Sequence, residues 1–299
     1  MDKIGEKIKS LRISKRMTQS ELAGDQITRN MLSLIENGSA LPSLQTIMYL
    51  SERLGVPAGI LLARESEELL YKKMRELPKI KARYKAGEYK LCAAMCEDLI
   101  GDESDDEINH LLSMCHFNLA KEAFNAGKLH TSCMEFDLAC MHSENTIYGS
   151  GHIRSTVAVY FEYMLRLSPT LTSDFGYDSF DGEYVFSDPF CRYARALISF
   201  EKGDVAIAES YCAEYGDKES CYVSHIKALV RMSKGDYASA KVRLEAIMNS
   251  DDPDCRVIMY DVFKNLEECC RETDDYKGAY GYSVGKVELL EHMLVETGM

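Results

Sequence analysis

The sequence predicts an all-α protein with a small amino-terminal domain and a longer domain of repeated helical hairpins. Apolar residues recur at helical spacing through the first sixty residues, and turn-forming residues recur at regular intervals in the rest. The length of 299 residues also fits two domains better than one. We therefore expect one domain over residues 1–64 and a second over residues 65–299.

The two parts carry opposite charge. The whole chain has a formal net charge of -13, which disfavours nucleic acid as a partner. Residues 1–64, however, hold nine Lys or Arg and six Asp or Glu, a local charge of +3, so the remainder carries -16. This asymmetry predicts that the first domain binds an anion and the second does not.

Composition and cysteine usage indicate a cytoplasmic protein. There is no run of 18 apolar residues, and the first twenty residues mix acidic and basic side chains, so we expect neither a membrane span nor a signal peptide. The eleven cysteines are an odd number with irregular spacing, which indicates reduced, mostly packing thiols. They form no CxxC pair, so no metal site and no cofactor are expected.

The sequence of the first domain predicts five short helices. Ile4, Ile8 and Leu11 give the first helix an apolar face. Thr18 and Glu21 form a capping box at the start of the second helix.

The later helices of this domain have their own start and stop signals. Thr28 caps a third helix, whose inward residues are Met31 or Leu32 together with Ile35. Asn37 and Gly38 end that helix, and a fourth begins at Pro42 and Ser43 and keeps the 3.6-residue period to Leu54.

Four sequence blocks resemble the phage-repressor-like XRE family of helix-turn-helix domains. They are M-T-Q-S-E-L-A (17–23), I-T-R-N-M-L-S-L-I-E-N-G (27–38), P-S-L-Q-T-I (42–47) and L-G-V-P (54–57). The resemblance implies that the third helix lies in the major groove of operator DNA while the second crosses the backbone. The turn between Ala23 and Thr28 is a residue shorter than the usual family pattern.

The same resemblance implies a set of DNA-contacting residues at the second helix, the third helix and the next helix start. They are Gln19, Thr28, Arg29, Asn30, Ser33, Asn37 and Ser43. Arg pairs with guanine and Asn with adenine in the major groove, while Asn37 and Ser43 at helix ends suit phosphate. A solvated helix face is the alternative for Arg29 and Asn30. Glu36 is expected to tie helices together and not to touch DNA.

The second part of the chain contains a repeated turn motif. The motif starts are Gly87, Gly127, Gly203, Gly235 and Asp274, and a small residue follows each by five positions: Cys92, Ser132, Ala208, Ala240 and Ala279. The turn and the small residue together describe a hairpin of two closely packed helices.

This motif resembles the tetratricopeptide repeat, whose period is about 34 residues. About five to six hairpins are expected, with an irregular unit at residues 165–190. The aromatic and acidic stretch at 170–186 is either a lid over the repeat groove or a surface insertion.

Stacked hairpins of this kind form a solenoid whose first helices line a concave groove. The tetratricopeptide pattern gives as ligand-binding candidates Phe117, Lys121, Asn125, Tyr193, Tyr222 and His225, with Leu197, Leu229 and Lys264 as further lining positions. Packing between helices is the alternative for each aromatic residue.

The order of the two domains is similar to that of the RRNPP peptide-responsive quorum-sensing regulators of Gram-positive bacteria. The resemblance implies a homodimeric transcription regulator that binds double-stranded operator DNA and a short peptide in the repeat groove. The alternative is a DNA-anchored scaffold whose repeats recruit a protein segment, with no small ligand. No phosphate loop or catalytic motif is present, so we do not expect an enzyme.

Overall fold

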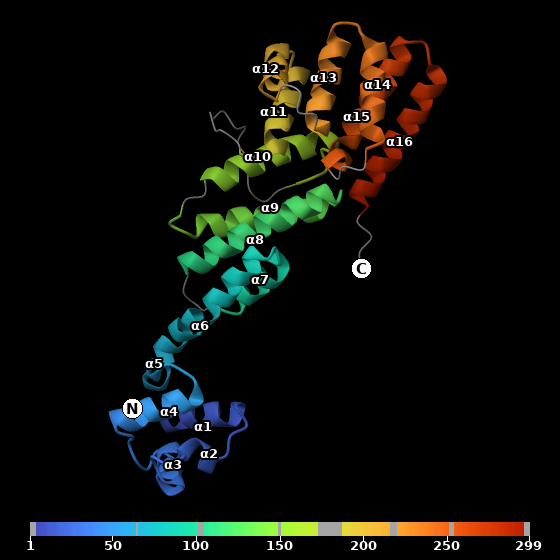
Figure 1. The fold of residues 1–299 in the computed structure, drawn as a ribbon. Helices are drawn as coiled ribbons and strands as arrows, with labels where there is room; N and C mark the ends of the chain where they lie inside the picture. Colours follow the sequence, from blue (N-terminus) through green and yellow to red (C-terminus); the bar gives the residue numbers. More distant parts are fainter. Residues whose placement is uncertain are drawn as a thin grey trace. The chain divides into compact units, whose positions relative to one another are not determined.

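The computed structural model describes residues 4–63, 65–100, 105–148, 151–172, 187–215, 220–250 and 254–295 (Figure 1). Within these ranges the chain forms helices and no strand, which confirms the all-α class. None of the helices described is long and apolar enough to cross a membrane.

The chain divides into two compact units, Met1–Ala82 and Arg83–Met299. The division falls inside α6 (Glu65–Lys85). The domain boundary predicted after residue 64 lies at the start of this helix, and it stays a prediction.

The first unit holds five short helices before α6, as the sequence predicts. They are α1 (Ile4–Ser14), α2 (Gln19–Ala23), α3 (Arg29–Glu36), α4 (Leu44–Leu54) and α5 (Ala58–Leu62). Their apolar faces meet in one core that includes Ile8, Leu22 and Leu50. Helices this short owe their stability mostly to such packing.

Side-chain caps fix where these helices begin. The Thr18 hydroxyl accepts from the Glu21 amide while the Glu21 carboxylate accepts from the Thr18 amide, so the predicted capping box is confirmed. Gly5 lets α1 lie close to α3, because a Cβ at this position would stand 1.9 Å from the Ile35 carbonyl oxygen.

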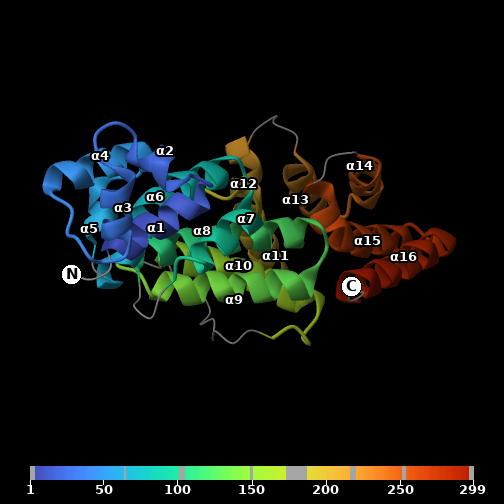
Figure 2. The ribbon, with the colours of Figure 1, turned by 90° about the horizontal axis from the view of Figure 1, so that it is seen from below.

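The second unit is built from helical hairpins. After α6 the helices are α7 (Tyr89–Glu97), α8 (Asp106–Asn125), α9 (Leu129–Glu144), α10 (Gly151–Leu167), α11 (Pro189–Glu201), α12 (Val205–Tyr215), α13 (Cys221–Ser233), α14 (Tyr237–Met248), α15 (Asp254–Glu272) and α16 (Tyr276–Leu294). The pairs α8 with α9 and α15 with α16 lie side by side in both ribbon views (Figures 1 and 2).

Each predicted turn motif lies between the two helices of a hairpin. All five motif starts have positive φ: Gly87 77°, Gly127 75°, Gly203 93°, Gly235 80° and Asp274 58°. Asp274 is the one that carries a side chain, and Asp is among the residues that enter this region at moderate cost. The repeat identified in the sequence is therefore a repeat of backbone geometry.

The small residue after each turn is buried. Ser132 shows why size matters here, since its hydroxyl donates to the Ala120 carbonyl of the facing helix at 3.0 Å. A larger side chain at this position would force the two helices apart.

One unit is incomplete in the part of the chain that is described. Helix α10 has no second helix before residue 172, and most of the stretch predicted as a lid or an insertion, 173–186, lies outside the described residues. Further along, α15 also contacts α8 and α16 contacts α9, so the last hairpin returns against the second one.

The eleven cysteines form no disulfide; ten are buried and Cys212 is half-buried. Burial raises the pKa of Cys96 to about 12, which keeps this thiol protonated. These are the properties of packing residues.

Candidate functional site

Helix α3 has an exposed side and a buried side. Leu32, Ile35 and Glu36 are buried, Asn30 lies opposite them, and Arg29 is exposed in the first turn. Met31 is 46% exposed, which decides the choice between Met31 and Leu32 as the inward residue. Within the described residues Arg29 and Asn30 form no side-chain hydrogen bond, and their DNA-binding roles stay predictions.

Glu36 holds three helices of the first unit together. Its carboxylate accepts from Arg12 Nε at 2.6 Å and Nη2 at 2.9 Å, and from Gln19 Nε2 at 2.8 Å. These groups come from α3, α1 and the start of α2, and Glu36 is only 3% exposed. The expectation that Glu36 joins helices is confirmed.

The Glu36 carboxylate is ionised in this setting. Burial opposes its ionisation, but hydrogen bonds from Arg12 and Gln19 and the charge of Arg12 outweigh it, so the pKa of Glu36 lies below its ordinary value. The nearby charge of Lys9 acts in the same direction.

Three of the predicted DNA contacts have structural partners in the protein. Gln19 donates to Glu36, Thr28 accepts from the Met31 amide at 3.1 Å, and Ser43 accepts from the Thr46 amide at 3.2 Å. These bonds fix the starts of α2, α3 and α4. The DNA-binding roles of all three residues stay predictions.

The end of α3 lies beside a hollow of about 570 Å³ next to α1. Lys9, Ser10, Asn37 and Gly38 are among its lining residues. Asn37 is exposed, and Ser33 is half-buried one turn before it. Glu6 and Glu36 line the same hollow, and the phosphate contact of Asn37 stays a prediction.

In the second unit, three predicted ligand-binding residues lie along α8. Lys121 pairs with Asp188 at 2.6 Å, and its ammonium group stands 5.7 Å from the ring centroid of Phe117. Asn125, one turn further on, is exposed.

The other three predicted ligand-binding residues lie in the interior. Tyr193 and His225 are 0% exposed, and Tyr222 is buried and stacked on Tyr193 with ring centroids 4.9 Å apart. Asn265 Nδ2 donates to His225 Nε2 at 2.8 Å, which leaves Nδ1 to donate to the Tyr193 hydroxyl oxygen at 2.8 Å. The structure gives all three a packing role, the alternative left open above.

Burial has a clear effect on His225. Desolvation lowers its pKa to about 4, so the imidazole is neutral at physiological pH. With both ring nitrogens bonded to protein groups, His225 has no hydrogen-bonding capacity left for a ligand.

The further lining positions meet in one groove. A hollow of about 320 Å³ lies along α11, α13 and α15, and it includes Leu197, Leu229 and Lys264. The first helices of three successive hairpins thus share this groove, which is the geometry expected of a repeat solenoid.

A partly buried ionic network borders this groove, and the sequence pattern does not single it out. Arg166 donates to Glu201 at 2.7 Å and to Asp261 at 3.0 Å, and Tyr163 donates to Asp261 at 2.7 Å. Lys264, on the groove wall, completes it by pairing with Glu201 at 3.0 Å. Its members come from α10, α11 and α15, so no spacing along the chain identifies them.

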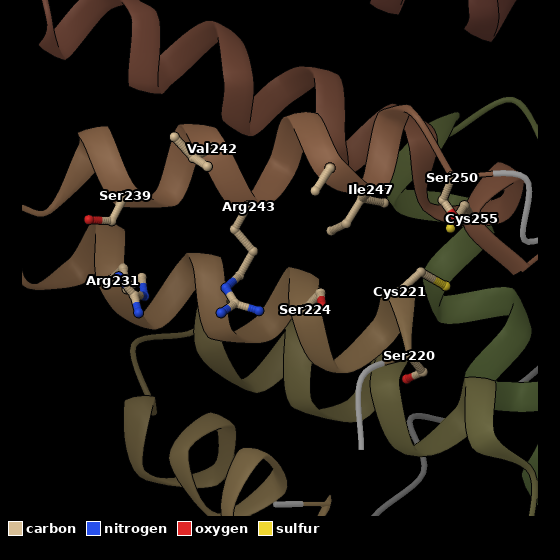
Figure 3. A pocket seen from close by; sticks show the side chains of 11 residues that line it. Ser220, Cys221, Ser224, Arg231, Ser239, Val242, Arg243, Ile247, Ser250 and Cys255 are labelled. Carbon is tan, nitrogen blue, oxygen red and sulfur yellow. The ribbon is translucent and has the colours of Figure 1, made fainter. Parts of the chain in front are cut away.

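A separate hollow of about 580 Å³ lies between α13 and α14. Figure 3 shows Arg243 pointing from α14 toward α13, with Arg231 and Ser239 near one end. Arg231 pairs with Asp236 at 3.4 Å.

The family comparison bears on the first unit. Residues 8–61 match the model of a helix-turn-helix family. The matched range contains α2 and α3, so it covers the exposed face of α3 described above. No curated protein matches this chain.

Three solved structures are similar to the chain at low identity. PlcR from Bacillus thuringiensis, in complex with the peptide PapR7 and DNA, is 15% identical over 99% of this chain and 100% of PlcR, with a TM-score of 0.27. ComR from Streptococcus thermophilus, in complex with DNA and its signalling peptide ComS, is 14% identical over 96% and 99%, with a TM-score of 0.24. The apo competence regulator ComR from Streptococcus vestibularis is 16% identical over 96% and 98%, with a TM-score of 0.20.

Proposed function

Because residues 8–61 form a helix-turn-helix domain of the XRE type, we propose that the protein is a sequence-specific DNA-binding transcription regulator. The single observation that supports this most strongly is the exposure of Arg29 and Asn30 on α3. Arg and Asn are the two side chains best suited to bidentate contacts with guanine and adenine. The local charge of +3 in an acidic chain adds attraction to phosphate.

Selection from a random double-stranded DNA library tests this proposal. The full chain is expected to enrich one sequence, and Asn30→Ala is expected to relax the choice of base at one position of it. Arg231→Ala, which removes an exposed arginine of the second unit, serves as the control. Failure of the wild-type protein to enrich any sequence would overturn the proposal.

We further propose that the groove along α11, α13 and α15 binds a short peptide that changes operator binding. Its walls combine apolar side chains with charged and amide groups, which is what a peptide with mixed side chains requires. The groove residues are Leu197, Phe200, Glu201, Leu229, Met232, Ser233, Tyr237, Lys264, Asn265 and Glu268. A peptide that favours one curvature of the repeats would shift the equilibrium between two states of the regulator.

A pair of charge reversals tests the groove. Glu268 and Glu272 are both exposed on α15, but only Glu268 lines the groove. Peptides enriched from a random library by the wild-type chain are expected to bind Glu268→Lys at least tenfold more weakly and Glu272→Lys unchanged. Equal binding by both variants would contradict a peptide site in this groove.

Dimerisation is the third part of the proposal. An exposed apolar stripe runs along α16 through Tyr276, Tyr280, Val284 and Val287, which are 68%, 74%, 37% and 51% exposed. Exposed stripes of this kind mark protein contacts, and a dimer would place two reading helices on paired half-sites. Tyr280→Asp is expected to yield a monomer in analytical ultracentrifugation, whereas an unchanged dimer would exclude this stripe as the interface.

A further inference from the structure

Leu34 is an apolar residue on the exposed side of α3. It lies on α3 four residues after Asn30, so the two side chains are neighbours on the same face of the helix. Leu34 is 48% exposed although the helix buries Leu32 and Ile35 in the core. The outward ridge of α3 thus carries one amide and one apolar group side by side.

We propose that Leu34 is a specificity-determining residue that contacts the C5-methyl group of a thymine in the operator. This inference rests on the proposed function, because it takes α3 as the reading helix. In the major groove the thymine methyl is the one apolar group that a base edge displays. An exposed leucine beside a base-reading asparagine is suited to that group and to no hydrogen-bonding edge.

The surroundings of Leu34 favour DNA as its partner. Arg29, in the first turn of the same helix, is exposed, and the domain that carries both has a local charge of +3. A domain of net positive charge attracts the phosphates that flank the methyl groups of the major groove. The backbone at Leu34 is also fixed, because its carbonyl accepts from the amides of Ser39 at 2.8 Å and Ala40 at 3.1 Å.

Deoxyuridine substitution tests the proposal, because it removes the methyl group and leaves every hydrogen-bonding group of thymine in place. Each thymine of the sequence enriched by the full chain is replaced in turn, and binding is measured by fluorescence anisotropy. With the wild-type protein, replacing one particular thymine of each half-site by deoxyuridine is expected to lower the affinity for DNA about fivefold. With Leu34→Ala the same replacement is expected to have no effect.

Leu41→Ala is the matched control, since Leu41 is a 72% exposed leucine of the same unit outside α3. Leu41→Ala is expected to lose about fivefold in affinity on deoxyuridine replacement, as the wild-type protein does. Because Leu34 is half exposed, Leu34→Ala is expected to leave the melting temperature unchanged, and its binding loss then reports a contact with DNA.

The possible outcomes separate this inference from the proposed function. The inference is wrong if no deoxyuridine replacement lowers the affinity of the wild-type protein, or if the replacement lowers the affinity of Leu34→Ala by the same factor. The proposed function would stand in both cases. A loss of self-association in Leu34→Ala with the penalty intact would assign Leu34 to a protein contact and overturn it as well. Failure to enrich any sequence would overturn the proposed function and this inference with it.

Discussion

Two pairs of predicted binding residues, one in each unit, lie in opposite environments. In the first unit Arg29 and Asn30 lie exposed on α3, whereas in the second unit His225 and Tyr193 are fully buried and bonded to each other. Helix α3 is covered on one side, but α13 packs against α11, α14 and α15 and has little free surface. A polar residue at helical spacing therefore indicates a binding face only where few helices surround it.

The largest change in the free energy of unfolding is expected in the second unit, at the ionic network of Arg166 and Asp261. Arg166→Ala leaves Asp261, which is 1% exposed, without its cationic partner. The free energy of unfolding should fall by about 3 to 5 kcal/mol, measured by chemical denaturation. Arg231→Ala, which breaks a surface pair, should cost less than about 1 kcal/mol. Equal losses in the two variants would contradict the buried role of Arg166.

A smaller effect is expected from the titration of His225. Burial lowers its pKa to about 4, so between about pH 6.5 and pH 4 the unfolded chain binds a proton that the folded chain does not. Stability should therefore fall as the pH drops through this window, by about 3 kcal/mol for this residue.

A variant assigns that loss to its source. Desolvation and His116 also lower the pKa of His142 to about 4, so two histidines contribute to the slope. His225→Gln should roughly halve the change of unfolding free energy between pH 6.5 and pH 4. A slope that is the same in this variant as in the wild type would place the titrating groups elsewhere.

The first unit should show the smallest of these stability effects. Glu36→Gln weakens the bonds from Arg12 and Gln19 and should cost about 2 kcal/mol at neutral pH. The pKa of Glu36 is depressed by these partners, so its contribution is present above the ordinary carboxyl pKa and is lost as the pH falls through the folded value. Glu52→Gln, at an exposed site of α4, is the control for thermal unfolding.

Local signals in the sequence were sufficient for most of the fold. The capping box at Thr18, the burial of Ile35 and the left-handed turn at Gly127 each depend on residues close in the chain, and the structure confirms them. The network of Arg166 and Asp261 could not be predicted in this way, because its members are 95 residues apart and meet only through the stacking of hairpins.

The candidate binding residues differ in the same way: some depend on residues close in the chain and others on distant ones. Arg29 and Asn30 could be selected because a short capped helix fixes their direction within a few residues. The burial of Tyr222 and His225 follows from neighbouring hairpins, which helical periodicity within α13 does not describe. Leu34 was not a candidate on sequence grounds, since its exposure depends on how α3 is rotated in the core.

If the exposed residues of α3 read DNA, Arg29→Ala should remove most of the preference for the enriched sequence. The measurement compares affinity for the enriched sequence and for a scrambled duplex at one salt concentration, together with the melting temperature. We predict that the ratio of the two affinities falls about ten- to a hundredfold while the melting temperature stays that of the wild type. A ratio unchanged from that of the wild type and of the Arg231→Ala control would contradict the account.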